Sequence, residues 1–68
     1  MVKIEKEYEG KYIAFNDKTG ECADIVRIYE YNAYGKDKVR YRVDFKGITK
    51  LSLVTLTEAK SYARKLVK

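Results

Sequence analysis

The sequence predicts an α+β fold in which an antiparallel sheet of three to five strands packs on one C-terminal helix. Two observations predict this arrangement. Residues 2–54 form short β-prone runs separated by turn residues, whereas residues 56–67 carry apolar residues at helical spacing. The chain has only 68 residues, which allows one small domain, spanning 1–68, with a single core.

The sheet is expected to have two parts. Residues 1–21 form an N-terminal hairpin or extension, with runs at 2–8 and 11–16 broken at Gly10. Residues 22–54 form the main antiparallel sheet, with strands at 22–31, 38–45 and 48–54. A loop with Asn32 and Gly35 joins the first two of these strands, and a tight turn at Lys46-Gly47 joins the last two.

The helix is expected at 56–67, where the hydrophobic period changes. The residues on its apolar stripe are Leu56, Ala59, Ala63 and Leu66. Thr55 and Glu58 have the spacing of a capping box at its start. Basic residues in the last turn complement the helix dipole.

The run KVRYRVDF at 38–45 separates two kinds of side chain. One parity is apolar (Val39, Tyr41, Val43, Phe45), and the other is mainly cationic (Lys38, Arg40, Arg42, Asp44). One helix covers only one face of a small sheet. We therefore expect the apolar parity to face the helix, joined by Leu51 and Leu53, and the cationic parity to lie on an open face.

The parity of residues 22–31 is harder to assign. The preferred interpretation buries Val26 and Ile28 and places Arg27, Tyr29 and Tyr31 on the open face. The opposite parity, which buries Ile25 and Tyr29, stays open. The residues expected to be mostly buried are Val26, Ile28, Tyr41, Val43, Phe45, Leu53, Ala59, Ala63 and Leu66.

Residue types argue against an enzyme. The chain has one cysteine, Cys22, and no histidine, so it lacks the usual metal ligands and the commonest general base. We expect no catalytic residue, no metal and no cofactor. The apolar runs are too short to span a membrane and no signal peptide is visible, so a cytoplasmic location is expected.

Charge is distributed unevenly along the chain, whose net charge is +5. Residues 1–34 hold five basic and seven acidic residues, and residues 35–68 hold ten basic and three acidic residues. This asymmetry indicates a polyanionic partner for the second half. Arginine on a strand face is the sharper signal, because its planar fork suits phosphate and base edges.

The run VRYRVDFKGITKLSLVTLTEAKSYARKL, within residues 38–66, resembles a known DNA-binding family. It looks like the N-terminal DNA-binding domain of phage-type tyrosine integrases, which is similar to the plant ethylene-response-factor domain. The resemblance implies a three-stranded sheet against the helix, with the open face in the major groove. It also implies that Arg40 and Arg42 face the groove, with Lys50 and Ser52 beside them.

The basic strand pair followed by an EAK helix also resembles the C-terminal half of double-stranded-RNA-binding domains, although the preceding helix that those domains need is not evident. We therefore expect a small nucleic-acid-binding module, with duplex DNA favoured. Its candidate binding residues are Arg40, Arg42, Lys38, Arg27, Lys50, Ser52, Tyr29 and Tyr31. The alternative is a protein-interaction module, such as a phage-type inhibitor of a host protein, and a third possibility is a homodimer through the sheet face. The sequence leaves the oligomeric state and the choice of DNA or RNA open.

Overall fold

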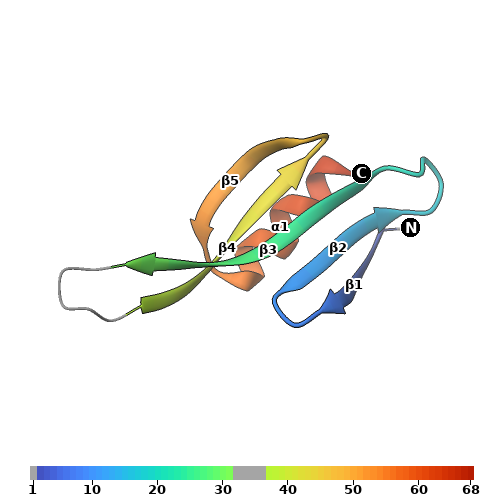
Figure 1. Cartoon of the computed structure of the whole chain (residues 1–68). Coiled ribbons are helices and arrows are strands. Elements are labelled where there is room, and N and C mark those ends of the chain that lie inside the picture. Colours follow the sequence, from blue (N-terminus) through green and yellow to red (C-terminus); the bar gives the residue numbers. More distant parts are fainter. Residues whose placement is uncertain (1, 32–36) are drawn as a thin grey trace.

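The computed structural model describes residues 2–31 and 37–68 and contains one open five-stranded antiparallel sheet with a helix on one face (Figure 1). The elements are β1 (Val2–Tyr8), β2 (Lys11–Asn16), β3 (Cys22–Tyr31), β4 (Asp37–Phe45), β5 (Ile48–Val54) and α1 (Leu56–Leu66). Each strand pairs with the next one along the chain. The predicted α+β fold is confirmed, with five strands. The loop predicted around Asn32 and Gly35 lies outside the described residues.

The tight turn between β4 and β5 is made by Lys46 and Gly47. Both have positive φ, 54° and 77°, and Phe45 pairs directly with Ile48. Two successive residues with positive φ give the hairpin turn whose twist matches that of the flanking strands. Glycine at the second position adopts this conformation without a steric penalty.

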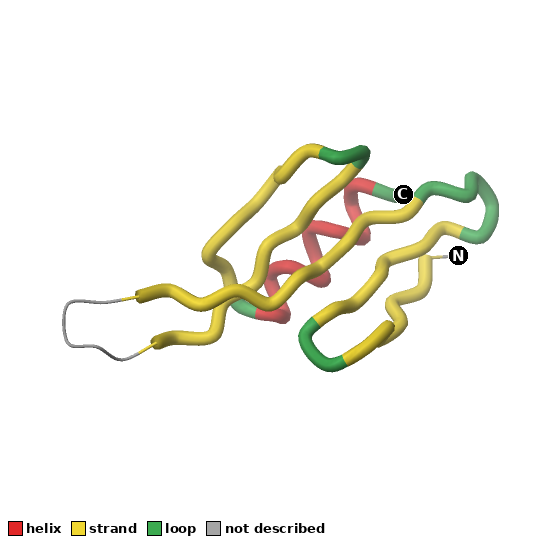
Figure 2. Tube along the Cα trace, in the orientation of Figure 1, coloured by secondary structure: helices red, strands yellow, loops and turns green. Residues whose placement is uncertain are grey.

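The predicted capping box opens α1. The Oγ1 atom of Thr55 accepts a hydrogen bond from the backbone N–H of Glu58 and donates one to the Glu58 carboxylate at 3.0 Å. The first contact gives a partner to one free N–H group of the first turn, and the second holds the Glu58 carboxylate against the Thr55 hydroxyl. The helix then runs along one face of the sheet, as Figure 2 shows in red behind the strands.

The core is a thin layer between α1 and the central strands. Its buried residues are Ala14, Ala23, Ile25, Val43, Ala59, Ala63 and Val67, each no more than 1% exposed. Four of these are alanines, two from the helix and two from the sheet. Such small side chains let the helix backbone come close to the strands, and Ile25 and Val43 fill the space between them.

The preferred parity for β3 is wrong. Ile25 is fully buried and pairs with Val43 on the helix side, whereas Val26 and Ile28 are only partly buried on the open side, opposite Arg42 and Arg40. Both parities of this run contain apolar residues, so alternation alone could not decide between them. The pairing with β4 determines which parity of β3 faces the helix. Only one parity of β4 is apolar, and the β3 residues paired directly with it lie on the same face of the sheet.

The prediction for Leu53 is also wrong. Leu53 has φ 57° and is 54% exposed, while Leu51 pairs with Val43 and Val54 pairs with Tyr41 on the helix side. The pairing of β4 with β5 shifts at two places, and each shift inserts an extra residue into β5. A bulge of this kind changes which side chain faces the core. Tyr41, Phe45 and Leu66 are partly buried against the core.

Asn16 connects the end of the helix to the turn between β2 and β3. Its Nδ2 atom donates to the backbone carbonyl of Val67 at 2.7 Å. Its Oδ1 atom accepts hydrogen bonds from the backbone N–H groups of Lys18 and Thr19. This buried side chain therefore holds together two parts of the chain that are far apart in sequence.

The parity of β3 can be tested by shortening one side chain on each face. Ile25→Val should lower the free energy of unfolding by about 0.5–1.5 kcal/mol, because it leaves a small cavity in the core. Ile28→Val, on the open face, should cost clearly less. Urea denaturation followed by circular dichroism measures both. Equal losses would contradict the assigned faces.

Asn16→Ala should destabilise the fold by about 1–3 kcal/mol, because the carbonyl of Val67 and two turn N–H groups lose their partner. Lys18→Ala removes an exposed side chain from the same turn and should leave the unfolding midpoint almost unchanged. A thermal melt of the two variants beside the parent measures the difference. Asn16→Ala melting with the parent would show that the helix end is held in another way.

Candidate nucleic-acid interface

The outer part of the β3–β4 hairpin is only two strands wide. The pairing of β2 with β3 reaches Val26, and the pairing of β5 with β4 reaches Tyr41. Beyond these points, residues 28–31 and 37–40 pair only with each other. We call this part the ribbon. Figure 1 shows it extending past the helix and the other strands.

Three of the predicted binding residues lie on the ribbon with described side chains. Lys38 and Arg40 are on the open side, paired with Glu30 and Ile28. Tyr29 lies on the opposite side and is 59% exposed. The side chain of Tyr31 falls outside the part of the chain that is described. The ribbon thus brings these residues together, but on two faces rather than one.

Arg27 lies at the base of the ribbon and not on the open face, where it was predicted. It shares the parity of Ile25 and Tyr29, and its Cζ atom is 5.9 Å from the centroid of the Tyr29 ring. Its backbone N–H donates to the carbonyl of Gly10 at 2.7 Å. A Cβ atom on Gly10 would come within 3.1 Å of the Arg27 Nε atom, so glycine leaves room for the guanidinium.

The carboxylate of Glu9 faces Arg27 from the turn between β1 and β2. Glu9 Oε1 lies 3.5 Å from Arg27 Nη1, and Glu9 Oε2 lies 2.8 Å from Lys6 Nζ. The hydrogen bond and charge of Lys6, with a smaller contribution from Arg27, lower the pKa of Glu9 below its ordinary value. Glu9 therefore remains an anion at neutral pH and partly neutralises Arg27.

Arg40 and Arg42 lie on the open face, each beside a carboxylate. Arg40 Nε is 3.4 Å from Glu30 Oε2, and Arg42 Nη2 is 3.0 Å from Asp44 Oδ2. Asp44 also accepts a hydrogen bond from the Thr49 hydroxyl at 2.8 Å. A guanidinium has five N–H donors, so each arginine keeps donors for a further acceptor.

Lys50 and Ser52 are both exposed on β5, the edge strand next to β4. Both lie in the segments where the pairing with β4 shifts. The structure brings Lys38, Arg40 and Arg42 together along one strand. It places Lys50 and Ser52 on the neighbouring strand, without a continuous register to β4.

The sequence interpretation missed Glu30 and the apolar members of the open face. Its apolar members, each on the parity away from the helix, are Ile13, Phe15, Val26 and Ile28. The signal was present in β2, where Ile13 and Phe15 alternate with Tyr12 and Ala14, but both parities are apolar there. Asp44 was already placed on the face of Arg42 by the alternation of β4, whereas Glu30, the partner of Arg40, could have been found only from the strand pairing.

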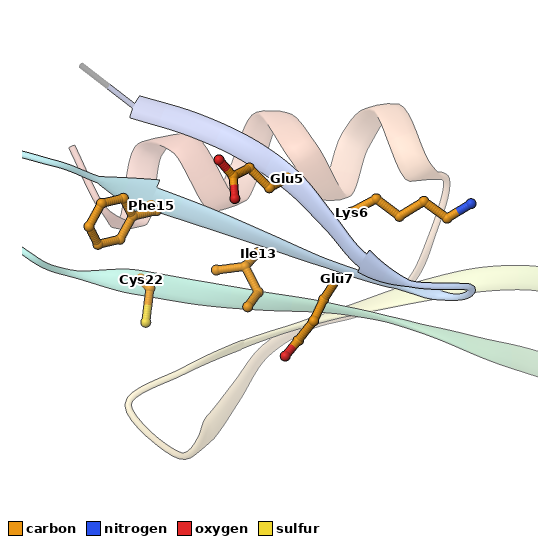
Figure 3. Close-up of a pocket in the computed structure, with 6 residues that line it drawn as sticks. All are labelled: Glu5, Lys6, Glu7, Ile13, Phe15 and Cys22. Atoms are coloured by element: carbon orange, nitrogen blue, oxygen red, sulfur yellow. The ribbon is translucent and has the colours of Figure 1, made fainter.

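A shallow hollow of about 400 Å³ lies on the open face at β1, β2 and β3. Figure 3 shows the residues that line it, which are Glu5, Lys6, Glu7, Ile13, Phe15 and Cys22.

Within residues 2–31 and 37–68, no three His, Cys, Asp or Glu side chains are grouped so that they could hold a metal ion. In the same residues, no helix has the length and apolar character needed to cross a membrane.

Comparison of the chain with protein families, with curated proteins and with solved structures found no match. The site is therefore interpreted from its own geometry and charge.

Proposed function

We propose that this chain binds nucleic acid, with duplex DNA as the preferred form, through the ribbon and the adjoining part of β4. The width of the ribbon is the observation that carries the proposal, because the major groove of B-DNA admits a two-stranded β-ribbon. Inside a groove both faces of the ribbon meet the walls. Lys38 and Arg40 would then face one strand of the duplex, and the exposed ring of Tyr29 would face the other strand.

The ion pairs of Arg40 and Arg42 are compatible with this proposal. Both pairs are partly exposed, and ion pairs of this kind contribute about 0–1 kcal/mol to stability. A phosphate can therefore replace or share a carboxylate at low cost, and charge-assisted bonds to arginine are among the strongest available to it. Before binding, Glu30 and Asp44 hold the two guanidiniums close to the face.

A second function, binding to a protein, is favoured by a different observation. The open face carries apolar side chains near its centre, including Phe15, which is 41% exposed. The charges around them come in both signs and are partly matched. This composition is typical of a protein interface, whose core is depleted of charge and rich in aromatic side chains.

The two arginines should dominate the salt dependence of DNA binding. If about four phosphates are neutralised, log K should fall against log salt with a slope of about −3.6. Arg40→Ala with Arg42→Ala should flatten this slope by about 2 if both side chains touch phosphate. Fluorescence anisotropy with labelled duplex DNA, single strands and duplex RNA at several salt concentrations measures it.

Lys60→Ala with Lys65→Ala is the matched control, because it removes equal charge from the helix on the opposite layer. This pair should change affinity and slope much less. Equal losses for both pairs would indicate a bulk-charge effect and contradict the ribbon site. A protein that binds none of the three nucleic acids at low salt would leave protein binding as the function.

Glu30→Gln should tighten binding to duplex DNA by up to about fivefold, because it removes a carboxylate that competes with phosphate for Arg40. Glu5→Gln makes the same charge change at β1, outside the ribbon, and should have a smaller effect. Competition titrations against one labelled duplex compare the two. If both variants gained equally, Arg40 would not be the local contact.

A further inference from the structure

The strand β1 forms one of the two edges of the sheet, and Figure 1 shows it on the outside of β2. The other edge, β5, is irregular, because its pairing with β4 shifts at two places and Leu53 has φ 57°. Bulges of this kind protect an edge from pairing with another chain. The pairing of β1 with β2 runs without a shift from Val2 to Lys6, and no strand of the described residues lies beyond β1. This edge therefore presents a regular row of backbone groups.

Two hydrogen bonds at the ends of β2 show the direction in which its backbone groups point. The N–H of Asn16 donates to the carbonyl of Glu21 at 2.9 Å, and the carbonyl of Gly10 accepts from the N–H of Arg27 at 2.7 Å. Even-numbered residues thus bond toward β3 at both ends, and the pairing between these ends has no shift. Successive residues of a strand bond to opposite neighbours. The odd-numbered residues of β2, such as Ile13, therefore bond to β1.

The same alternation identifies the backbone groups on the free edge of β1. Lys3 and Glu5 pair with odd-numbered residues of β2, so their N–H and C=O groups point inward. The groups that point outward belong to Val2, Ile4 and Lys6. Each of these residues offers one donor and one acceptor to an added strand.

The side chains of β1 determine which strand this edge accepts. Lys3 and Glu5 are exposed on the open face, and Ile4 between them lies on the helix side, partly buried against the core. Charged side chains on an edge strand usually prevent pairing with other chains. Here Lys3 and Glu5 have opposite signs and stand two residues apart, so pairing with an identical strand is repulsive in some registers and attractive in one.

We propose that β1 pairs with β1 of a second copy of this chain, antiparallel about a two-fold axis at Ile4. In this register Lys3 lies opposite Glu5 of the second copy, and Glu5 lies opposite Lys3. These pairs occupy the positions without backbone bonds between them, where opposite side chains are closest. Ile4 lies opposite its own copy and Val2 lies opposite Lys6, with two backbone hydrogen bonds in each such pair. Five strands from each copy then form one continuous sheet with both helices on the same face.

The neighbouring registers are unfavourable. A two-fold axis at Lys3, Glu5 or Lys6 would place that charged residue directly opposite its own copy, and like charges in this position destabilise a sheet. An axis between two residues would set the outward backbone groups of one copy against the inward groups of the other. The register centred on Ile4 satisfies both the charges and the backbone.

The cations of α1 near this edge add a limited cost. A hollow of about 360 Å³ beside Val2 is lined by Ser61, Arg64, Lys65 and Lys68. The residue that the second copy brings opposite Val2 is Lys6, whose Nζ atom lies 2.8 Å from Glu9 Oε2. This ion pair carries no net charge, so its repulsion with the helix is small. The contact is one strand wide, and we expect a weak, reversible dimer. The proposal does not depend on nucleic-acid binding, because it uses none of the ribbon residues.

Sedimentation equilibrium of the whole chain at concentrations up to about 1 mM tests the proposal, and the parent should show a monomer–dimer equilibrium. Lys3→Glu should weaken dimerisation by about tenfold or more, because it sets a glutamate opposite Glu5 of the second copy twice in each dimer. Glu5→Lys should do the same by setting a lysine opposite Lys3. Mixed in equal amounts, the two variants should pair with each other about as tightly as the parent does with itself, since both opposite-charge pairs are restored.

Lys50→Glu is the matched control, because it makes the same charge change as Lys3→Glu on the opposite edge strand, β5. Each change lowers the net charge from +5 to 5 − 2 = +3, which would favour self-association if only the overall charge mattered. Lys50→Glu should therefore change dimerisation by less than about twofold. Circular dichroism of the variants below the dimerisation range separates loss of pairing from loss of fold.

Amide hydrogen exchange locates the contact on β1. The N–H groups of Ile4 and Lys6 should exchange more slowly as the protein concentration rises, because they gain a partner in the dimer. The N–H groups of Lys3 and Glu5 are already directed to β2 and should not respond to concentration.

Three outcomes would overturn the proposal. The first is a chain that stays monomeric at all concentrations, which would leave the edge to a strand of another protein. The second is failure of Lys3→Glu and Glu5→Lys to pair when mixed. The third is a dimer that Phe15→Ala dissociates and Lys3→Glu does not, because the open face would then be the contact.

Discussion

The close contact between one helix and one face of the sheet is the constraint on which the rest of the structure depends. α1 has eleven residues, and it meets β2 and β3 through alanines on both sides. Alanine contributes little apolar area, so stability relies on the few larger side chains that fill the layer, above all Ile25 and Val43. The hydrogen bond from Asn16 to Val67 then fixes the end of the helix against the turn between β2 and β3. Within residues 2–31 and 37–68, no second helix covers the other face.

The uncovered face follows from that constraint, and its composition separates it from an ordinary solvated surface. A solvated face needs only short polar or charged residues, whereas this one includes Ile13, Phe15, Val26 and Ile28. Their partial exposure is a cost that the fold does not recover by packing. Around them the charges differ between the two ends of the face. Cations gather on the ribbon side of β4, whereas β1 and β2 at the other end carry both signs, with Glu7 Oε2 3.2 Å from Lys11 Nζ.

The sequence was sufficient to predict the helix and the strands, but not which side chains of β3 and β5 face the helix. The period change after Thr55, the capping box and the turn at Lys46-Gly47 are local signals, and each is present in the structure. The faces of β3 and β5 depend on non-local pairing. In β3 both parities contain apolar residues, and the parity of Ile25 faces the helix because Ile25 pairs with Val43. In β5 two bulges, one with Leu53 at positive φ, change the faces in a way that a strict alternation cannot reveal.

The candidate site shows the same division. The alternation of β4 placed Arg40 and Arg42 on the open face correctly, because its two parities differ so sharply in polarity. Arg27 and Tyr29 were assigned to the wrong face, because the preferred parity of β3 was wrong. Of the two carboxylates beside the arginines, Asp44 follows from the alternation of β4, whereas Glu30 could not be predicted. Whether Glu30 meets Arg40 depends on the hairpin register, and that register is set by the whole length of β3 and β4.

The spacing along β4 separates the charges of the ribbon from those at the far end of the open face. Lys38 and Asp44 are six residues apart on one strand, and at about 3.4 Å per residue their backbones are about 20 Å apart. This exceeds the Debye length of about 8 Å at physiological ionic strength. The charge of Lys38 is therefore largely screened at the level of Asp44. Arg42 and Asp44 form an ion pair at 3.0 Å on this strand, so the cationic part of β4 ends at a matched pair of charges in which Arg42 keeps donors for a further acceptor.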